Sequence, residues 1–343
     1  MKEAIALLIN DIHVHKDNLA EFNKNWDEML SVCDRESVLD IIVGGDMFTS
    51  RSSQTLATLL AVKAALSRAT RKGISVTICE GNHDKVDQEM YEGYNHLWTG
   101  SFLEVVDTHK ALVWEDCDFC LLAMSYFPEN GSFLKKLELA VQDTLITFPQ
   151  FAKKDIILYI HEGVHGALGD FEIDGEVDQE PLLGFKAVLC GHYHNRTKIK
   201  GTNIEYIGSS RQHNFGEDEE KGYTLIYSDG SYSFVKNQVN TRYKTIEIDA
   251  KQVEKFKLEP DENYKYRVRV KCDEKQAKLF DKQVLINQGF HKVEVISKSA
   301  QPTAASSSDM QEKYDRQSIK REYQNYCNEN SVDSTLGIKY LEN

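Results

Sequence analysis

The sequence predicts an α/β fold whose later part is rich in β-strands, and two patterns along the first 240 residues support this. In the first half, short apolar runs typical of buried strands alternate with segments of helical periodicity, as at residues 5–9, 38–45 and 75–81. Strands that alternate with helices indicate mainly parallel pairing. After Cys190 the apolar runs become short strands separated by turns, and we expect these strands to form a second, antiparallel sheet.

The other elements of this part follow in chain order. Apolar side chains at helical spacing over residues 22–30 and 56–62 predict helices between the first three strands. Apolar runs at 121–127, 155–160 and 186–190 predict further buried strands. The strands expected in the antiparallel sheet lie in TNIEYIGS, GYTLIYSDG and SYSFVKN.

The character of the sequence changes near residue 240. The strand-like runs YKTIEI, YRVRVK and KVEVIS alternate with helical stretches and predict a small α+β module at 241–300. Residues 251–300 contain twelve basic and eight acidic side chains, which suits either a surface that contacts a nucleic-acid backbone or an ordinary solvated face. A polar linker (301–310) and a helical tail (311–343) follow the module.

Composition excludes several classes of protein. The 343 residues are 41% hydrophobic, with no apolar run near the roughly 18 residues of a membrane span. The N-terminus lacks the features of a secretory signal, and the seven cysteines show no disulfide-framework spacing, so we expect a reducing, cytoplasmic setting. The net charge of −13 argues against an electrostatic coat for nucleic acid but leaves room for a local binding site.

Five polar blocks stand just past apolar strand runs, and they carry the chemistry that we expect of this chain. The carboxyl ends of the strands in an open α/β sheet form the ligand crevice, so blocks in this position converge there. A glycine precedes three of the blocks and lets the backbone turn sharply. The blocks are Asp11-Ile12-His13, Gly45-Asp46, Gly81-Asn82-His83-Asp84, Gly191-His192-Tyr193-His194 and the lone His161.

Seven side chains of these blocks, His83 and Asp84 apart, form a set of metal ligands: two aspartates, one asparagine and four histidines. This mixture of oxygen and imidazole suits manganese, iron or zinc and contains too much nitrogen for calcium. Seven donors exceed the needs of one tetrahedral ion. A shared carboxylate would let them hold two ions about 3.5–4 Å apart, an arrangement used to hydrolyse phosphate esters.

In this order, the blocks resemble the calcineurin-like metallophosphoesterase superfamily over about residues 1–235. Three further features are similar to the SbcD-type double-strand-break repair nucleases of bacteria and phages. They are GGDMF followed by a loop rich in Ser and Arg, the segment IEYIGSSRQHNFGEDEEKGYTLI (204–226), and the order of the predicted parts. The resemblance implies a two-sheet metallophosphoesterase sandwich at 1–240, a small α+β capping and DNA-contact domain at 241–300, and C-terminal helices.

The resemblance also implies an activity and assigns roles to single residues. The activity is that of a DNA exonuclease or endonuclease with two Mn²⁺ ions, for which Mg²⁺ can substitute, in a repair or recombination complex. His83 matches the family's catalytic histidine, which orients the phosphate or protonates the leaving oxygen, and Asp84 is expected to orient His83 or a ligand. Some relatives carry a histidine or an acid where this chain has Thr49, which cannot titrate. One ion is assigned to Asp11, His13, Asp46 and His194, and the other to Asp46, Asn82, His161 and His192, with Asp46 bridging.

Three partners follow from the same resemblance: DNA, a second copy of the chain and an SMC-like ATPase of the SbcC type. SbcD-type nucleases grip the base of the ATPase's coiled coil with C-terminal helices. In the tail, Ile319, Tyr323 and Tyr326 have the helical spacing of anchors for such a surface, while a tail packed on its own domain is the alternative. The segment around Trp98 and Phe102 is the expected dimer contact.

Other interpretations of the motifs stay open at this point. The same two-metal centre serves phosphoprotein phosphatases and cyclic-nucleotide phosphodiesterases, and a scaffold with an inactive site is a further alternative. Residues 161–165 (HEGVH) fit the zinc-protease pattern H-E-x-x-H, but the glycine and the strand context disfavour the helix that this chemistry requires. Cys117 and Cys120 are expected in or near a hairpin, and His213 lies in a loop that could face the cleft.

Overall fold

The computed structural model describes residues 2–85, 87, 92–127, 132–169, 176–253, 255–273, 277, 280–297, 323 and 327. The chain divides into two compact units, one of residues 1–245 with 259–267 and one of residues 246–258 with 268–343. The predicted linker lies outside the described residues, as does the predicted tail except for Tyr323 and Cys327. The predicted domain boundaries stay predictions.

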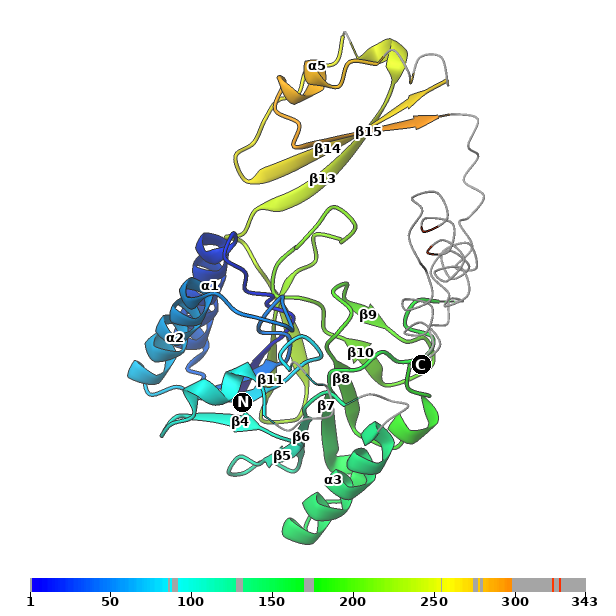
Figure 1. Cartoon of the computed structure of the whole chain (residues 1–343). Helices are drawn as coiled ribbons and strands as arrows, with labels where there is room; N and C mark the ends of the chain where they lie inside the picture. The colour runs from blue at the N-terminus through cyan, green and yellow to red at the C-terminus, as the bar shows by residue number, and fades with distance from the viewer. Residues whose placement is uncertain are drawn as a thin grey trace. The chain divides into compact units, whose positions relative to one another are not determined.

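The first unit contains two six-stranded sheets with helices outside them (Figure 1). The first sheet has the strand order β12-β11-β1-β2-β3-β4. The four strands β1 to β4 pair in parallel, which confirms the pairing expected for the first half of the chain. The last two strands, β11 and β12, pair antiparallel. The bounds are β1 Ala4–Ile9, β2 Asp40–Gly44, β3 Ser75–Cys79, β4 Leu103–Val106, β11 Gly222–Tyr227 and β12 Tyr232–Lys236.

The second sheet has the strand order β5-β6-β7-β8-β10-β9. Its central strands β6, β7, β8 and β10 are parallel, and β5 and β9 add antiparallel edges. The bounds are β5 His109–Leu112, β6 Cys120–Met124, β7 Ile156–Ile160, β8 Ala187–Cys190, β9 Thr197–Lys198 and β10 Ile204–Tyr206.

The prediction of a separate antiparallel sheet after Cys190 is therefore wrong. The strand β10 lies parallel to β8 in the second sheet, whereas β11 and β12 join the first sheet beside β1. Tyr223 and Leu225 of β11 pack into the core on one face of the first sheet, and Ile226 packs into the core on its other face. Buried side chains on both faces suit a strand in the interior of a sheet, which is where β11 lies.

Apolar side chains alternate between two faces along the central strands, and this alternation builds a layered sandwich. On β1, Ala6 and Leu8 belong to the core that both sheets share, whereas Leu7 and Ile9 pack with the first two helices. On β7, Tyr159 belongs to the shared core, and the next residue, Ile160, packs on the opposite face. The first unit is thus the two-sheet sandwich that the resemblance to the metallophosphoesterases implies.

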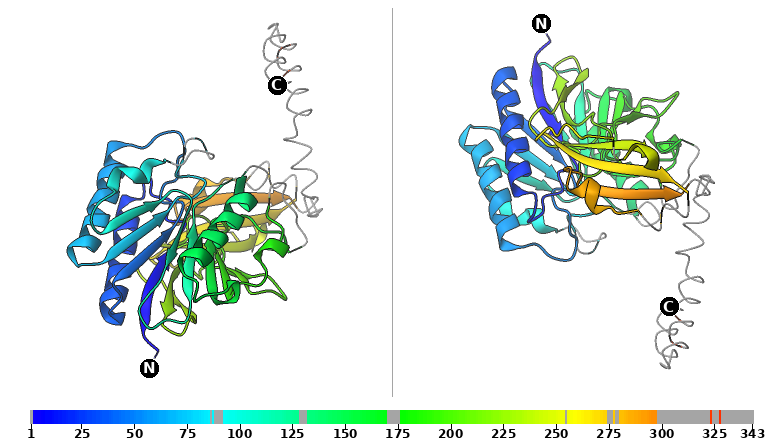
Figure 2. Two further views of the ribbon diagram at one scale, coloured as in Figure 1. Left: turned by 90° about the horizontal axis from the view of Figure 1, so that it is seen from below. Right: turned by 90° about the horizontal axis from the view of Figure 1, so that it is seen from above.

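In the described part of the first unit, three helices cover the outer faces of the sandwich. The helices α1 (Leu19–Glu36) and α2 (Leu56–Arg71) lie side by side on the first sheet, and α3 (Leu134–Thr147) packs on the second (Figures 1 and 2). Helix α2 begins after Thr55, whose hydroxyl accepts a hydrogen bond from the backbone N–H of Thr58. Short 3₁₀ segments lie at η1 (Tyr94–Trp98), η3 (Lys153–Asp155), η4 (Glu180–Leu182) and η5 (Ala250–Gln252).

A third sheet follows, with the order β13-β14-β15, in the α+β arrangement that the sequence predicts. Its strands are β13 (Arg242–Asp249), β14 (Tyr264–Cys272) and β15 (Lys292–Ser297), and the short helix α5 (Gln283–Ile286) precedes β15. Val268, Val270 and Cys272 of β14 are buried, so this sheet has one apolar face. In the described part of the chain, no helix has both the length and the hydropathy that a membrane span requires.

Candidate metal centre

The seven predicted ligand side chains lie together at the carboxyl ends of five strands. Parallel strands of one sheet end at the same edge, so the loops after them meet, and here loops of both sheets contribute. Asp11 and His13 follow β1, Asp46 follows β2, Asn82 follows β3, His161 follows β7, and His192 and His194 follow β8. We call these seven side chains the metal centre.

One group within the metal centre surrounds the space between His13 and His194. The Nε2 atom of His13 lies 3.0 Å from Nε2 of His194 and 3.6 Å from Oδ2 of Asp46. The Nε2 atom of His194 lies 3.8 Å from Oδ1 of Asp11. These four side chains are the ones that the resemblance assigns to the first ion.

A second group lies around His161. Its Nε2 atom is 3.4 Å from Oδ2 of Asp46 and 3.8 Å from Oδ1 of Asp11. The Nδ1 atom of His192 lies 3.3 Å from Oδ1 of Asn82. Asp46 thus faces His13 as well as His161, as a bridging ligand would, and Asp11 also faces a histidine of each group.

The buried polar atoms of the metal centre fit a cation. Asp11 and His161 are fully buried, Asp46 is 2% exposed, and Nε2 of His161 has no hydrogen-bond partner among the described residues. Burial lowers the pKa of His161, but the carboxylates of Asp46 and Asp11 outweigh burial and raise this pKa to about 10. The two carboxylates therefore draw positive charge into the cluster, and the donor set suits manganese, iron or zinc.

The loops of the metal centre have unusual backbone geometry. The carbonyl oxygen of His13 accepts hydrogen bonds from Nδ2 of Asn18 (2.8 Å), Oγ1 of Thr49 (2.9 Å) and Nη2 of Arg211 (3.2 Å). These three hydrogen bonds on one carbonyl hold His13 in the left-handed backbone conformation, which residues other than glycine rarely adopt. Four of the predicted ligands have a positive φ, between 48° and 87°: Asp11, His13, Asp46 and His192.

Glycines beside the ligands serve two different purposes. Gly45 has a φ of 100°, which confirms the sharp turn expected there. At Gly191, which is not among the glycines with positive φ, a Cβ atom would lie 2.5 Å from Oη of Tyr159 and 2.8 Å from Nδ1 of His161. Gly81 packs in the same way against Asp46. At Gly81 and Gly191, close packing rather than the turn requires glycine.

His83 lies beside the metal centre, with its ring edge-on to that of His13 at a centroid distance of 5.2 Å. Its backbone N–H donates to Oδ1 of Asp46 (2.8 Å), and its Nδ1 lies 2.7 Å from the carbonyl oxygen of Thr49. A carbonyl oxygen only accepts, so Nδ1 carries the proton of this bond. The Thr49 carbonyl therefore holds the ring of His83.

Asp84 connects two loops of the metal centre. Its Oδ1 accepts a hydrogen bond from the backbone N–H of Phe48 (3.1 Å), and its Oδ2 accepts one from Gly81 (2.8 Å). Burial and the charge of Asp46 raise the pKa of Asp84 to about 7. Asp84 thus fixes the loops that carry Asp46 and Asn82, while its expected effect on catalysis stays a prediction.

A cleft of about 440 Å³ opens beside the metal centre, and His83 and Thr49 line it. His213 also lines the cleft, as the sequence suggested. Arg211 and Tyr243, which line it too, were not found from the sequence. The only signal for Arg211 was its place in the segment 204–226, which resembles the SbcD-type nucleases.

Two rival motifs are resolved by their surroundings. Residues 161–165 form no helix, and Nδ1 of His165 lies 3.0 Å from Oδ1 of Asp178 rather than beside His161, so the zinc-protease interpretation fails. Cys117 lies in the loop between β5 and β6, and Cys120 begins β6. Because β5 and β6 are antiparallel neighbours, the predicted hairpin is confirmed.

Comparisons with curated proteins find relatives along most of the chain. Protein 244L of Invertebrate iridescent virus 6, provisionally named a phosphoesterase, is 25% identical over 297 residues, which cover 82% of this chain and 98% of that protein. Protein 078R of Invertebrate iridescent virus 3, with the same provisional name, is 22% identical over 83% of this chain and 82% of its own. The SbcD component of the SbcCD nuclease of Staphylococcus saprophyticus is 22% identical over 54% of each chain.

Among solved structures, the crystal structure of Pseudomonas putida nuclease MPE covers 57% of this chain and 65% of its own, at 18% identity. The TM-score of this match is 0.29. A family model described as calcineurin-like phosphoesterase matches residues 6–196, a stretch that is more than half of the chain and contains all seven residues of the metal centre. The chain therefore belongs to the calcineurin-like phosphoesterase family.

Proposed function

We propose that this phosphoesterase is a DNA nuclease that hydrolyses phosphodiester bonds with two Mn²⁺ ions, for which Mg²⁺ can substitute. The observation that carries the proposal is that Asp46 faces a histidine of each ligand group, at 3.6 Å from His13 and 3.4 Å from His161. A carboxylate shared by two ions is an arrangement used for in-line displacement at phosphorus. The likeness to the SbcD component of the staphylococcal SbcCD nuclease supports DNA as the substrate.

The chain's own residues hold the ions and move protons. When bound, the ions would lower the pKa of a water molecule and neutralise charge that develops on the phosphate. The Nδ1 atom of His83 donates to the Thr49 carbonyl, so Nε2 is the atom that can exchange a proton with a substrate in the cleft. We assign to His83 the orientation of the phosphate or the protonation of the leaving oxygen.

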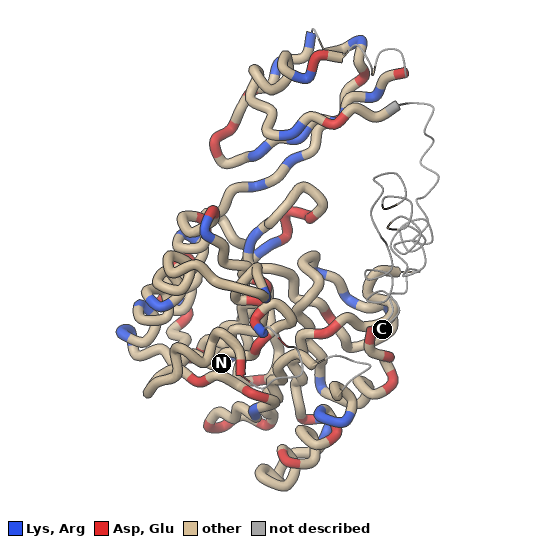
Figure 3. The backbone as a smooth tube through the Cα atoms, viewed as in Figure 1, with Lys and Arg blue, Asp and Glu red and all other residues tan. Residues whose placement is uncertain are grey.

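Basic side chains of the second unit support a contact with the DNA backbone. Basic positions recur along the strands of the three-stranded sheet (Figure 3). Arg269 and Lys271 pair with the partly exposed carboxylates of Glu294 (3.0 Å) and Glu247 (2.6 Å). Exposed ion pairs contribute only about 0–1 kcal/mol, so a phosphate can take the place of either carboxylate.

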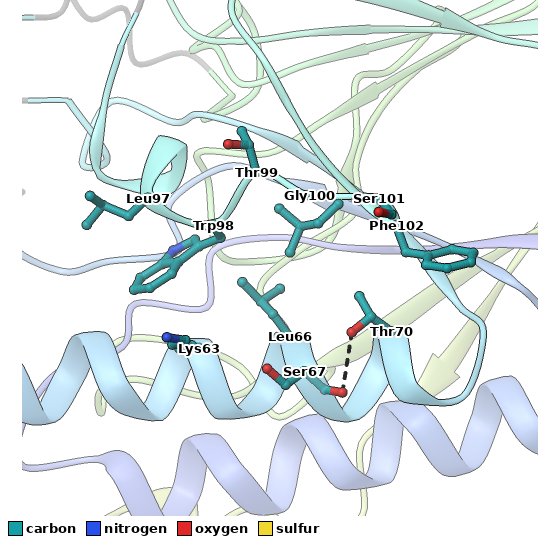
Figure 4. Close-up of a pocket in the computed structure, with 11 residues that line it drawn as sticks. Lys63, Leu66, Ser67, Thr70, Leu97, Trp98, Thr99, Gly100, Ser101 and Phe102 are labelled. Carbon is teal, nitrogen blue, oxygen red and sulfur yellow. Dashed lines mark hydrogen bonds between the residues drawn. The ribbon is translucent and has the colours of Figure 1, made fainter.

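A second copy of the chain is the partner that we propose for a groove between α2 and residues 97–103, which include the end of η1 (Figure 4). The groove measures about 390 Å³ and is lined by Leu66, Trp98 and Phe102 among others. Leu97, which lines the groove, is 63% exposed, and Leu60 of α2 is 54% exposed. Exposed apolar patches of this kind mark sites of association, and no residue of the metal centre lines this groove.

An SbcC-type ATPase is the remaining proposed partner, bound through Ile319, Tyr323 and Tyr326. Of these three, only Tyr323 is among the described residues. The helical spacing of the three side chains in the sequence and the likeness to the staphylococcal SbcD component support this partner. In such a complex the chain would act on DNA in the cytoplasm.

Hydrolysis assays of the full chain test the proposed function. A bis-aryl phosphodiester, linear DNA and a phosphoprotein would each be offered with Mn²⁺, with Mg²⁺ and with a chelator. We expect the phosphodiester and the DNA to be cleaved with Mn²⁺ and neither to be cleaved with the chelator. Hydrolysis of the phosphoprotein without cleavage of DNA would instead indicate a phosphoprotein phosphatase.

A further inference from the structure

Glu217 lies against His194 on the side of the ring that faces away from the other ligands. Its Oε1 is 2.9 Å from Nδ1 of His194, while Nε2 of the same ring points toward Asp11 and His13. An ionised carboxylate only accepts hydrogen bonds, so the proton of this pair lies on Nδ1. The lone pair of the neutral imidazole is then on Nε2, which is the atom that faces the proposed ion.

The carboxylate of Glu217 is itself fixed in place. Its side chain is 7% exposed, and its Oε2 accepts a hydrogen bond from the backbone N–H of His213 (3.0 Å). Oε1 accepts a second bond from Nδ2 of Asn214 (2.7 Å), and Nζ of Lys221 lies 3.6 Å from Oε2. The position of the carboxylate therefore does not depend on His194 alone.

Lys221 contacts the backbone of His194, whereas Glu217 contacts its ring. Its side chain is fully buried, and Nζ donates to the carbonyl oxygen of His194 (2.6 Å) and to Oδ1 of Asn195 (2.8 Å). Glu217 thus orients the ring of His194, and Lys221 holds the backbone of the same residue. Both come from the loop that precedes β11, so one short segment positions one ligand.

His161 offers a contrast within the same centre. Its outer nitrogen, Nδ1, faces the carbonyl oxygen of Gly44 at 2.8 Å, which is a neutral acceptor. A carboxylate makes the imidazole that it contacts a stronger electron donor than a carbonyl does. The carboxylate of Glu217 therefore makes His194 a stronger electron donor to a metal ion than the Gly44 carbonyl makes His161.

We propose that Glu217 is a positioning residue of the metal centre, which sets the tautomer and the direction of His194 and thereby the affinity for the ion between His13 and His194. The inference rests on the proposed two-ion centre. Loss of a partner of this kind typically lowers metal affinity by about 10- to 100-fold. We expect that loss for one ion, and little change for the ion beside His161.

Titration of the metal-free full chain with Mn²⁺ tests this, with free Mn²⁺ measured by its electron paramagnetic resonance signal. The variants are Glu217→Ala, which removes the acceptor, and Glu217→Gln, which keeps an acceptor oxygen without the charge. We expect one of two sites to weaken by about 10- to 100-fold in Glu217→Ala and by less in Glu217→Gln. Glu220→Gln is the matched control, because Glu220 is an exposed residue of the same loop that pairs with Lys236.

A second readout separates positioning from a purely structural role. If Glu217 acts through the ion, phosphodiester hydrolysis by Glu217→Ala should need more Mn²⁺ but recover near wild-type kcat at saturation. The proposal is overturned if either variant is folded and binds both ions as tightly as the wild type, if both sites weaken equally, or if Glu220→Gln shows the same loss. Should Glu217→Ala not fold, Glu217→Gln decides alone by the same criteria.

These outcomes are distinct from a failure of the proposed function. A wild-type chain that binds two Mn²⁺ ions but leaves DNA intact would refute the nuclease, while the Mn²⁺ titration of the variants would still measure the role of Glu217.

Discussion

The Nε2 atoms of His13 and His194 face each other at 3.0 Å, although 181 positions separate the two residues in the chain. His13 follows a strand of the first sheet and His194 follows a strand of the second, so the contact joins loops of both sheets. Two imidazole lone pairs repel at this distance unless a proton or a cation lies between them. The fold therefore brings these two rings together, and a proton or one of the proposed ions is needed to offset the repulsion between them.

Replacement of Asp46 by Asn should remove both ions. The carboxylate faces His13 and His161, and an amide of the same shape cannot supply the charge that holds two cations. Since the ions stabilise the transition state by several kcal/mol, hydrolysis should fall by about 10³-fold or more. Metal content by mass spectrometry and the rate on a bis-aryl phosphodiester measure both effects. Asp178→Asn, at an exposed carboxylate beside His165, is the control, and retention of both ions in Asp46→Asn would contradict the bridging role.

Replacement of His83 by Ala should separate chemistry from binding. The ring lies beside His13 but is held by the Thr49 carbonyl, so its loss should leave the ligands in place. We expect normal Mn²⁺ and DNA binding, with turnover lower by about 10²- to 10⁴-fold, the usual contribution of a positioned acid or base. His165→Ala serves as the control because His165 pairs with Asp178 outside the centre. A metal analysis that finds an ion missing in His83→Ala would mean that His83 is a ligand.

The sequence could predict that the seven side chains of the metal centre lie together, because the signal for this is local; their role as ligands stays a prediction. Asp11, Asp46 and His161 each stand just past an apolar run, and the ends of parallel strands meet in any sheet of this kind. Which sheet each of the later strands joins could not be predicted in this way. Whether β11 pairs with β1 or begins a new sheet depends on a contact between residues more than 200 positions apart, such as Leu8 and Thr224.

The residues that hold the predicted ligands in place could not be predicted from the sequence patterns either. Glu217 contacts Nδ1 of His194, and Arg211 donates to the carbonyl oxygens of Ile12 and His13. None of these contacts follows from a spacing or a periodicity in the sequence. The reason for Gly191 was likewise hidden, because a sharp turn and a close contact with Tyr159 both select glycine. The order of the predicted ligands can be read from the sequence, whereas the contacts that orient them depend on tertiary packing.

A methyl group at Gly191 should destabilise the fold. The Cβ atom of Gly191→Ala would lie 2.5 Å from Oη of Tyr159, a fully buried side chain that also bonds Gly44. Overpacking of this kind costs about 1–3 kcal/mol of unfolding free energy, which denaturant unfolding monitored by circular dichroism measures. Gly100→Ala is the control, because its Cβ would meet nothing closer than 3.8 Å and should change stability by less than about 0.5 kcal/mol. Equal stability of the two variants would show that Tyr159 moves aside freely.

A charge in the groove beside α2 should disrupt the proposed dimer. Phe102 lines the groove and is 50% exposed, so Phe102→Asp removes apolar contact area from the groove. The new charge is costly only where a second chain covers it and buries it. We expect the variant to be folded and monomeric at concentrations where the wild type is dimeric in analytical ultracentrifugation. Ile146→Asp, at an apolar side chain of α3 that is 77% exposed, should not change the oligomeric state. A wild-type chain that is monomeric at tens of micromolar would refute the dimer.

Truncation after Ala305 should separate catalysis from assembly. Residues 311–343 carry the stripe of Ile319, Tyr323 and Tyr326, which a helix of this length cannot bury on its own. All seven predicted ligands and His83 lie before residue 200, so folding, Mn²⁺ content and hydrolysis of a small phosphodiester should match those of the full chain. Co-purification with an SbcC-type ATPase, and any ATP-dependent processing of duplex ends, should be lost because aromatic anchors dominate such interfaces. A truncated chain that unfolds or loses its ions would instead place the tail against the catalytic domain, and the argument for a partner would fall.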